Sequence, residues 1–136
     1  MPTYRCTQLD DRGLIRLGGP DAHPFLQGLI SNDMGLLRPE SALYAALLTP
    51  QGKYLFDFLL YDRGDHLLLD AERARLPDLI RRLMLYRLRA QVTLEDVSAE
   101  VAVLAIFDRQ PVPAAAIPGT VVDPRLPELG LRIALP

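Results

Sequence analysis

The stretch SALYAALLTPQGKYLFDFLLYDR, residues 41–63, predicts two antiparallel strands joined by a tight turn. Its two arms are rich in Leu, Phe and Tyr, and they flank the four residues Thr49-Pro50-Gln51-Gly52. Proline fixes one turn dihedral, and glycine accepts the positive φ that many turns require. We therefore expect a β-hairpin at this position, and the remaining elements are placed relative to it.

Asp57 is the unusual residue of the second arm. Successive side chains of a strand point to opposite sides of the sheet. One face is expected to hold Lys53, Leu55, Asp57, Leu59 and Tyr61, and the other Tyr54, Phe56, Phe58 and Leu60. A carboxylate between leucines is costly unless something partners it, so Asp57 is the candidate catalytic residue. If this face lines a pocket, desolvation should raise the pKa of Asp57 unless a cation compensates. The alternative is a solvated Asp57 on an open sheet face.

Composition favours one ordinary domain. The chain has 136 residues, 49% of them hydrophobic, and a net charge of −2, which argues against disorder and against a nucleic-acid partner. The single cysteine, Cys6, allows no internal disulfide, and neither histidine has a metal-ligand partner at useful spacing. The N-terminus lacks a signal-peptide pattern, and no run of about 18 uncharged apolar residues occurs. We expect a cytoplasmic protein without a membrane partner and without a bound metal.

Hydrophobic periodicity predicts an α+β fold, with a mixed or antiparallel sheet and two helices packed on it. Besides the hairpin, the expected strands are 3–8, 14–17, 66–70, 91–95, 101–107 and 131–135, and the expected helices are 20–30 and 71–88. The second helix should bury one stripe formed by Leu76, Leu79, Ile80, Leu83 and Met84, and its arginines should form a solvated basic face.

We divide the chain at residue 108. Residues 1–108 are expected to form the α+β domain, and residues 109–136 a loop, including PVPAAAIPG, and a strand leading into a second half that this sequence lacks. Strand 131–135 would then lie at a sheet edge, either disordered or paired with another copy of the chain. Self-association of the chain through this strand is the resulting expectation.

Short catalytic motifs are missing: the sequence has no Gly-rich phosphate loop, HExxH, GxSxG or CxxC. Five segments carry a resemblance instead: LIRLGGPDAHPFLQGLISND, ALYAALLTPQGKYLFDFLLY, LLLD, LIRRLMLYRLRAQVTLED and VVDPRLPELGLRI. In this order they resemble the N-terminal part of the YgfZ family, folate-binding proteins related to the T-protein (aminomethyltransferase) of the glycine cleavage system. The resemblance implies a GcvT-like folate-binding domain, tetrahydrofolate or a derivative as cofactor, and a role in iron–sulfur cluster assembly or repair with iron–sulfur proteins as partners.

The resemblance also implies site residues. Asn32, within Ser31-Asn32-Asp33, matches the edge of the pterin pocket in the related transferases, Tyr44 matches a tyrosine of their central hairpin, and Asp57 matches the carboxylate that faces the reactive nitrogens of folate. Leu69 and Asp70, at the end of LLLD, complete the expected cofactor-binding set.

Two departures from the family pattern keep other functions open. Phe56 replaces the first of two adjacent acids of the transferases, and the family motif Lys-Gly-Cys-Tyr-x-Gly-Gln-Glu does not occur. One alternative is a folate-dependent one-carbon (aminomethyl) transferase or demethylase, in which Asp57 positions or deprotonates the cofactor nitrogen. The other is a non-catalytic structural module.

Overall fold

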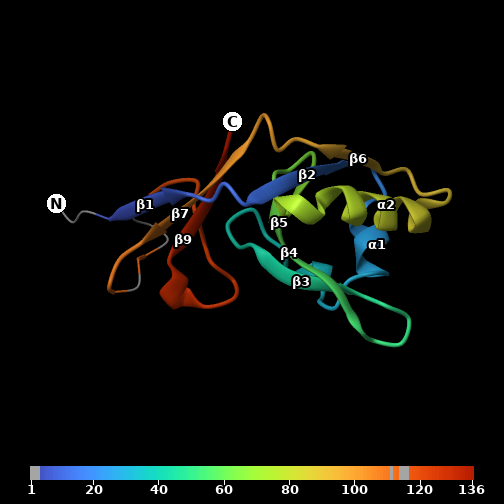
Figure 1. Cartoon of the computed structure of the whole chain (residues 1–136), viewed down its shortest axis with the longest axis horizontal. Helices are drawn as coiled ribbons and strands as arrows, with labels where there is room; N and C mark the ends of the chain where they lie inside the picture. The colour runs from blue at the N-terminus through green and yellow to red at the C-terminus, as the bar shows by residue number, and fades with distance from the viewer. Residues whose placement is uncertain (1–3, 111, 114–116) are drawn as a thin grey trace.

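The computed structural model describes residues 4–110, 112–113 and 117–136, and its strands form two antiparallel sheets that lie next to each other (Figure 1). The α+β class is confirmed. The sequence led us to expect one sheet, but the strands divide into a five-stranded and a four-stranded sheet. Thr3, at the start of the first predicted strand, and four residues of PVPAAAIPG lie outside the described residues.

The five-stranded sheet contains the predicted hairpin. Its order is β3 (Leu43–Leu48), β4 (Tyr54–Asp62), β5 (Leu67–Glu72), β2 (Arg12–Gly18) and β6 (Thr93–Asp96). Helices α1 (Ala22–Gln27) and α2 (Leu76–Arg87), with the short 3-10 segments Met34–Leu36 and Arg73–Arg75, accompany it. One face of the sheet and the two helices enclose the larger core, in which Phe58, Leu60, Leu69, Leu79 and Leu83 are fully buried.

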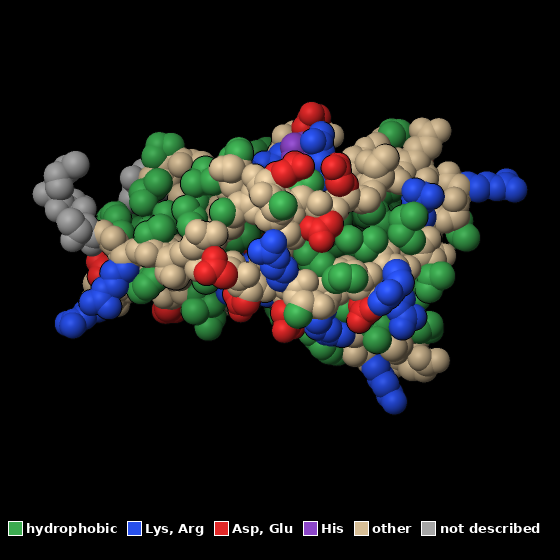
Figure 2. Space-filling model, turned by 45° about the horizontal axis from the view of Figure 1, so that its top comes forward, with side chains coloured by type: hydrophobic (Ala, Val, Ile, Leu, Met, Phe, Trp, Pro, Cys, Tyr) green, Lys and Arg blue, Asp and Glu red, His purple; other side chains and the backbone are tan. Residues whose placement is uncertain are grey.

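Helix α2 follows its predicted stripe with one exception. Leu76, Leu79 and Leu83 are fully buried and Ile80 packs against the core. Met84 is 41% exposed, so its expected place in the buried stripe is wrong. The reason is geometric, because each residue of a helix turns 100° from the last and Met84 comes one residue after the buried position 83. Green hydrophobic side chains are visible on the half of the surface that carries α2 (Figure 2).

The four-stranded sheet has the order β1 (Arg5–Gln8), β7 (Ala102–Phe107), β9 (Leu131–Leu135) and β8 (Val121–Val122). The expected edge position of strand 131–135 is wrong. β9 pairs with β7 along its whole length and with β8 at its first two residues, so self-association is not needed to satisfy this strand. Residues after 108 thus complete a sheet begun by β1 and β7, and the 3-10 segment Pro127–Leu129 leads into β9.

The hairpin turn is confirmed. Gly52 has a φ of +85°, its N–H donates to the carbonyl of Thr49 at 2.9 Å, and the N–H of Thr49 donates to the carbonyl of Lys53 at 2.7 Å. A glycine at this position avoids the clash between Cβ and backbone that other residues suffer at positive φ.

A β-bulge changes the faces of the second arm. Leu47 lies opposite Phe56, whereas Leu48 lies opposite Tyr54, so Leu55 is an extra residue in β4. A bulge of this kind redirects the neighbouring side chains. Leu55 packs against the helix-side core, and Tyr54 lies on the same face as Asp57. The predicted faces of these two residues are therefore exchanged.

The second face of the five-stranded sheet meets the four-stranded sheet. Leu14, Leu59, Tyr61 and Leu68 from the first pack with Val103, Val121 and Ala134 from the second. This face also carries Asp57, because Asp57, Leu59 and Tyr61 alternate along β4. Asp57 and the contact between the sheets thus share one face of the larger sheet.

Candidate functional site

Asp57 is held by two tyrosines. The hydroxyl of Tyr44, on the neighbouring strand β3, donates to Oδ2 of Asp57 at 2.6 Å. The hydroxyl of Tyr54, redirected by the bulge, donates to Oδ1 at 3.1 Å. Each carboxylate oxygen therefore has one phenol donor, and both tyrosines remain exposed on an open sheet surface. We call Tyr44, Tyr54 and Asp57 the tyrosine–aspartate cluster.

Asn32 lies beside this cluster. Its side-chain nitrogen donates to the carbonyl oxygen of Tyr44 at 2.9 Å, and its side-chain oxygen accepts from the N–H of Asp33 at 2.8 Å. Ser31 fastens the same segment to β3, because its hydroxyl accepts from the N–H of Ala46 at 2.9 Å and its own N–H donates to the carbonyl of that residue. The structure thus brings together three predicted site residues, Asn32, Tyr44 and Asp57.

The pKa of Asp57 is lowered: the increase predicted for an uncompensated carboxylate in a pocket does not occur, because hydrogen bonds and a nearby cation compensate. Burial has the strongest single effect on this pKa and raises it, as predicted. Hydrogen bonds from Tyr44 and Tyr54 and the positive charge of Arg12 together outweigh that effect. The hydrogen bond between Tyr44 and Asp57 is the largest cause that raises the pKa of Tyr44, and burial is the next. At neutral pH the cluster is an ionised carboxylate between two neutral phenols.

Removing one phenol should shift this balance. We expect Tyr44→Phe to raise the pKa of Asp57 toward the ordinary aspartate value of about 3.9. A group with a lowered folded-state pKa stabilises the fold above its unfolded pKa and loses that effect as the pH falls through its folded pKa. In the variant the folded and unfolded pKa values lie closer together, so the contribution of Asp57 should be smaller and its loss should be complete at a higher pH than in the wild type. A carbon-13 NMR titration of the Asp57 carboxyl measures the shift. Tyr86→Phe, at a tyrosine that packs against the helix-side core, is the control, and an unchanged midpoint in Tyr44→Phe would contradict the expectation.

Leu69 and Asp70 are not part of the exposed cluster. Leu69 is fully buried in the helix-side core, and Asp70 is fully buried between the two sheets. Asp70 accepts from Nε of Arg12 at 2.7 Å, from the hydroxyl of Tyr61 at 2.6 Å and from Nη2 of Arg132 at 2.9 Å. With these partners Asp70 joins the sheets and presents no surface to a ligand.

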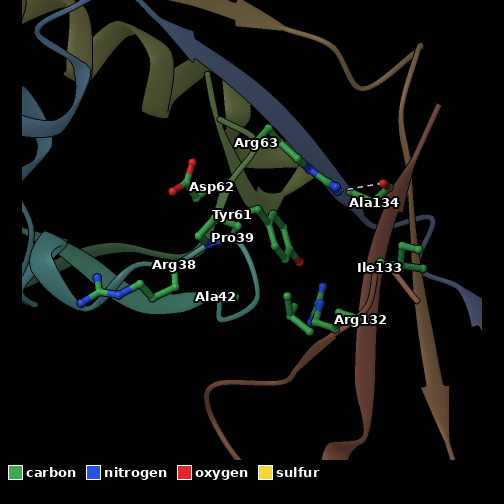
Figure 3. Close-up of a pocket in the computed structure, with 11 residues that line it drawn as sticks. Arg38, Pro39, Ala42, Tyr61, Asp62, Arg63, Arg132, Ile133 and Ala134 are labelled. Carbon is green, nitrogen blue, oxygen red and sulfur yellow. Dashed lines mark hydrogen bonds between the residues drawn. The ribbon is translucent and has the colours of Figure 1, made fainter. Parts of the chain in front are cut away.

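Arg132 extends this buried network. It comes from β9, its side chain is 4% exposed, and its Nη1 lies 3.6 Å from Oδ2 of Asp123. Arg125 holds the same carboxylate through two nitrogens, at 3.0 and 2.7 Å. Figure 3 shows Tyr61 and Arg132 beside a small hollow between β4 and β9, where Arg63 also donates to the carbonyl of Ala134 at 2.8 Å. Burial raises the pKa of Tyr61 strongly, and the charge of Asp70 raises it further, so the hydroxyl stays a donor.

Several residues of these sites were missed by the sequence analysis: Tyr54, Arg12, Tyr61, Asp123, Arg125 and Arg132. The signal for Arg132 was its charge inside an otherwise apolar strand pattern, which is the same signal that singled out Asp57. For Tyr54 no local signal exists, because its face depends on the bulge.

The arrangement suits recognition of N–H donors. An ionised carboxylate has more acceptor positions than two phenols occupy, and charge-assisted hydrogen bonds are the strong ones. Asp57 lines none of five surface hollows found among the described residues, so a ligand would rest on an open surface of this chain. No group of three or more potential metal ligands occurs in the described part of the chain. Within the same residues, no helix is long and apolar enough to cross a membrane.

The fold matches part of a known aminomethyltransferase structure. The crystal structure of the glycine cleavage system aminomethyltransferase T from Bartonella henselae matches 96% of this chain and 41% of its own, with a TM-score of 0.72 and 22% identity. No protein-family model matches the chain.

Two relatives define the sequence similarity. The chain is 34% identical over 154 residues to the mitochondrial iron–sulfur cluster assembly factor IBA57 of Homo sapiens, a match that covers 96% of this chain and 42% of the relative. It is 34% identical over 118 residues to the aminomethyltransferase of Shouchella clausii, covering 86% of this chain and 31% of the relative. The chain thus spans less than half the length of these relatives and is related to both iron–sulfur assembly factors and aminomethyltransferases.

The expected cytoplasmic location is overturned by this comparison. The human relative and its counterpart in Mycosarcoma maydis are both named as mitochondrial proteins. The expectation depended on the absence of a secretory signal-peptide pattern near Met1. The absence of that pattern does not distinguish a cytoplasmic protein from a mitochondrial one.

Proposed function

We propose that the chain is the folate-site half of a YgfZ-type protein that supports iron–sulfur cluster assembly or repair. The observation that carries the proposal is the 34% identity to human IBA57 over 96% of the chain, on a fold shared with an aminomethyltransferase. Residues 1–108 would supply the folate-facing sheet, and residues 109–136 would brace it through β8 and β9. Iron–sulfur proteins would be the partners.

The tyrosine–aspartate cluster fits a reduced folate by its donor and acceptor set. A pterin ring presents N–H groups, and Asp57 is an ionised acceptor whose orientation is fixed by Tyr44 and Tyr54. Asn32 would complete the edge of the site next to Tyr44. When bound, tetrahydrofolate or a derivative would supply the capacity to carry a one-carbon unit. The open surface around Asp57 provides one wall, and a second polypeptide segment would have to provide the other.

Asp57→Ala should weaken binding of tetrahydrofolate by about 1.5 to 3 kcal/mol, or roughly tenfold to 150-fold in Kd, because a hydrogen bond to a charged acceptor is lost. Isothermal titration calorimetry measures the change. Asp62→Ala is the matched control, since Asp62 ends the same strand and its Oδ1 accepts from the N–H of Gly64, away from the cluster. Unchanged affinity in Asp57→Ala, with native stability, would remove Asp57 from the site.

The role in iron–sulfur assembly is tested in cells. We expect deletion of the gene to lower the activity of iron–sulfur enzymes and to spare enzymes without clusters. The wild-type gene should restore the activity, and the Asp57→Ala gene should restore less of it. Normal activity of every iron–sulfur enzyme in the deletion strain would contradict the proposal.

Aminomethyl transfer is the second candidate function, and the similarity to the Shouchella clausii aminomethyltransferase favours it. In that case Asp57 would position or deprotonate the folate nitrogen. Phe56 stands where the transferases carry a second acid, and its side chain is buried in the helix-side core, away from Asp57. Steady one-carbon transfer to tetrahydrofolate, abolished by Asp57→Asn, would favour this function over the first.

A further inference from the structure

Helix α2 carries a second apolar stripe that the fold leaves uncovered. Its first stripe, at Leu76, Leu79 and Leu83, is fully buried against the sheet. Met84, Leu85 and Leu88 are 41%, 69% and 87% exposed. Met84 and Leu85 lie in the last turn of the helix and Leu88 directly follows its last residue, Arg87, so the three lie at the same end of α2. Soluble proteins rarely leave contiguous apolar surface of this kind without a binding partner.

Leu88 shows that the exposed stripe is not a by-product of core packing. It follows the last residue of α2 and has a φ of +47°, the one positive value among the described non-glycine residues. Glycine or asparagine is the usual residue at such a helix end, because a branched side chain is strained there. The leucine side chain points into solvent and gains no burial in return.

The exposed stripe borders a groove between α2 and the start of β4. Its apolar floor consists of Leu55, Phe56, Ile80, Met84 and Leu85. Its rim is basic, with Arg75, Arg81 and Arg82, and one acid, Asp78, which is bound by Arg81. The guanidinium of Arg75 lies 4.1 Å above the ring of Phe56 and so covers part of the floor with positive charge.

The charge around this groove is opposite to that of the whole chain. Residues 72–89 contain six arginines against two acids, whereas the chain has a net charge of −2. Basic side chains border hydrophobic ones on this half of the molecule in Figure 2. A positive rim around an apolar floor is complementary to a segment whose centre is apolar and whose sides are acidic.

We propose that the groove between α2 and β4 binds an acidic amphipathic segment of a partner protein. Such a segment places its apolar side chains on Leu55, Met84 and Leu85 and its carboxylates against Arg81 and Arg82. The groove lies between two elements, α2 and β4, so a segment laid along it meets side chains of both.

A synthetic amphipathic peptide of leucine and glutamate, about five helical turns long and labelled with fluorescein, is the probe. We expect saturable binding to the 136-residue chain by fluorescence anisotropy. Two variants should each weaken it by about tenfold or more: Leu85→Ser, and Arg81→Glu combined with Arg82→Glu. All three positions are at the surface of α2, and circular dichroism checks that the variants fold. Leu36→Ser and Arg5→Glu, exposed residues on other elements, are the matched controls and should leave binding unchanged.

Three results would overturn the proposal. The first is no saturable binding of the acidic peptide, and the second is equal binding of a peptide with lysine in place of glutamate. The third is tighter binding, through the same arginines, of phosphatidylserine vesicles or of an oligothymidylate. Because no variant alters Asp57, folate binding by the Leu85→Ser protein shows separately whether the proposed folate site stands.

Discussion

Replacing Asp70 by alanine is expected to lower the free energy of unfolding by about 3 to 5 kcal/mol, the usual cost of removing one partner from a buried ion pair. Asp70 is fully buried and accepts from Arg12, Tyr61 and Arg132. Without it, Arg132 loses its shortest ion pair and keeps a longer contact of 3.6 Å to Asp123. The remaining buried positive charge, more than the lost contacts, accounts for the size of the effect.

Urea denaturation at pH 7 measures this change in the free energy of unfolding, and two further variants serve as comparisons. Asp70→Asn keeps the shape and one acceptor oxygen but removes the charge, so it should fall between the wild type and Asp70→Ala. Asp65→Ala removes an exposed carboxylate that pairs with His66, and it should cause no measurable change. An Asp70→Ala protein as stable as the wild type would show that the network between the sheets contributes no net stability.

The position of the network explains why Asp70 matters for the proposed site without forming part of it. In the pairing of β5 with β4, Asp70 lies opposite Leu59. Leu59 is two residues after Asp57 in the same strand. Arg12 contacts Asp70 directly and also lowers the pKa of Asp57 by its charge. The resemblance suggested Asp70 as a cofactor residue; in the structure Asp70 lies on the same sheet face as Asp57, and its partners join the two sheets beside the tyrosine–aspartate cluster.

Local chemistry allowed the hairpin and the helices to be predicted. Pro50 and Gly52 determine a turn by their own dihedral preferences, and the buried stripe of α2 follows from residue spacing alone. The bulge at Leu55 could not be predicted in this way, because it depends on which residues of β3 lie opposite β4. Tyr54 was consequently assigned to the wrong face, and one of the two donors to Asp57 was missed.

The second sheet could not be predicted from the sequence for a related reason. An apolar strand pattern shows that a segment forms a strand but not which strand is its neighbour. β9 pairs with β7, whose residues are more than twenty positions earlier in the chain. Arg132 forms an ion pair with Asp70 across 62 positions of sequence. The predicted exposed edge at residues 131–135 was therefore wrong, although the strand itself was correctly predicted.

Gly130→Ala is the second substitution expected to have a large effect. Gly130 precedes β9 and has a φ of +90° and a ψ of −146°, a region that is essentially restricted to glycine and costs other residues about 1 to 3 kcal/mol. A Cβ at this position would overlap the carbonyl oxygen of Ile106 and lie 3.1 Å from Cα of Phe107, both in the backbone of β7. Forcing atoms into a filled site costs about a further 1 to 3 kcal/mol.

The chain offers a control that separates these two effects. Gly52 has a similar φ of +85°, but a Cβ built there meets no atom within 4 Å. We expect Gly52→Ala to lower the free energy of unfolding by about 1 to 2 kcal/mol, and Gly130→Ala by about 2 to 6 kcal/mol, both measured by urea denaturation. The difference reports how closely β9 approaches β7. If the two variants were equally stable, residue 130 would not be pressed against β7, and the inner position of β9, on which the contact between Arg132 and Asp70 depends, would be wrong.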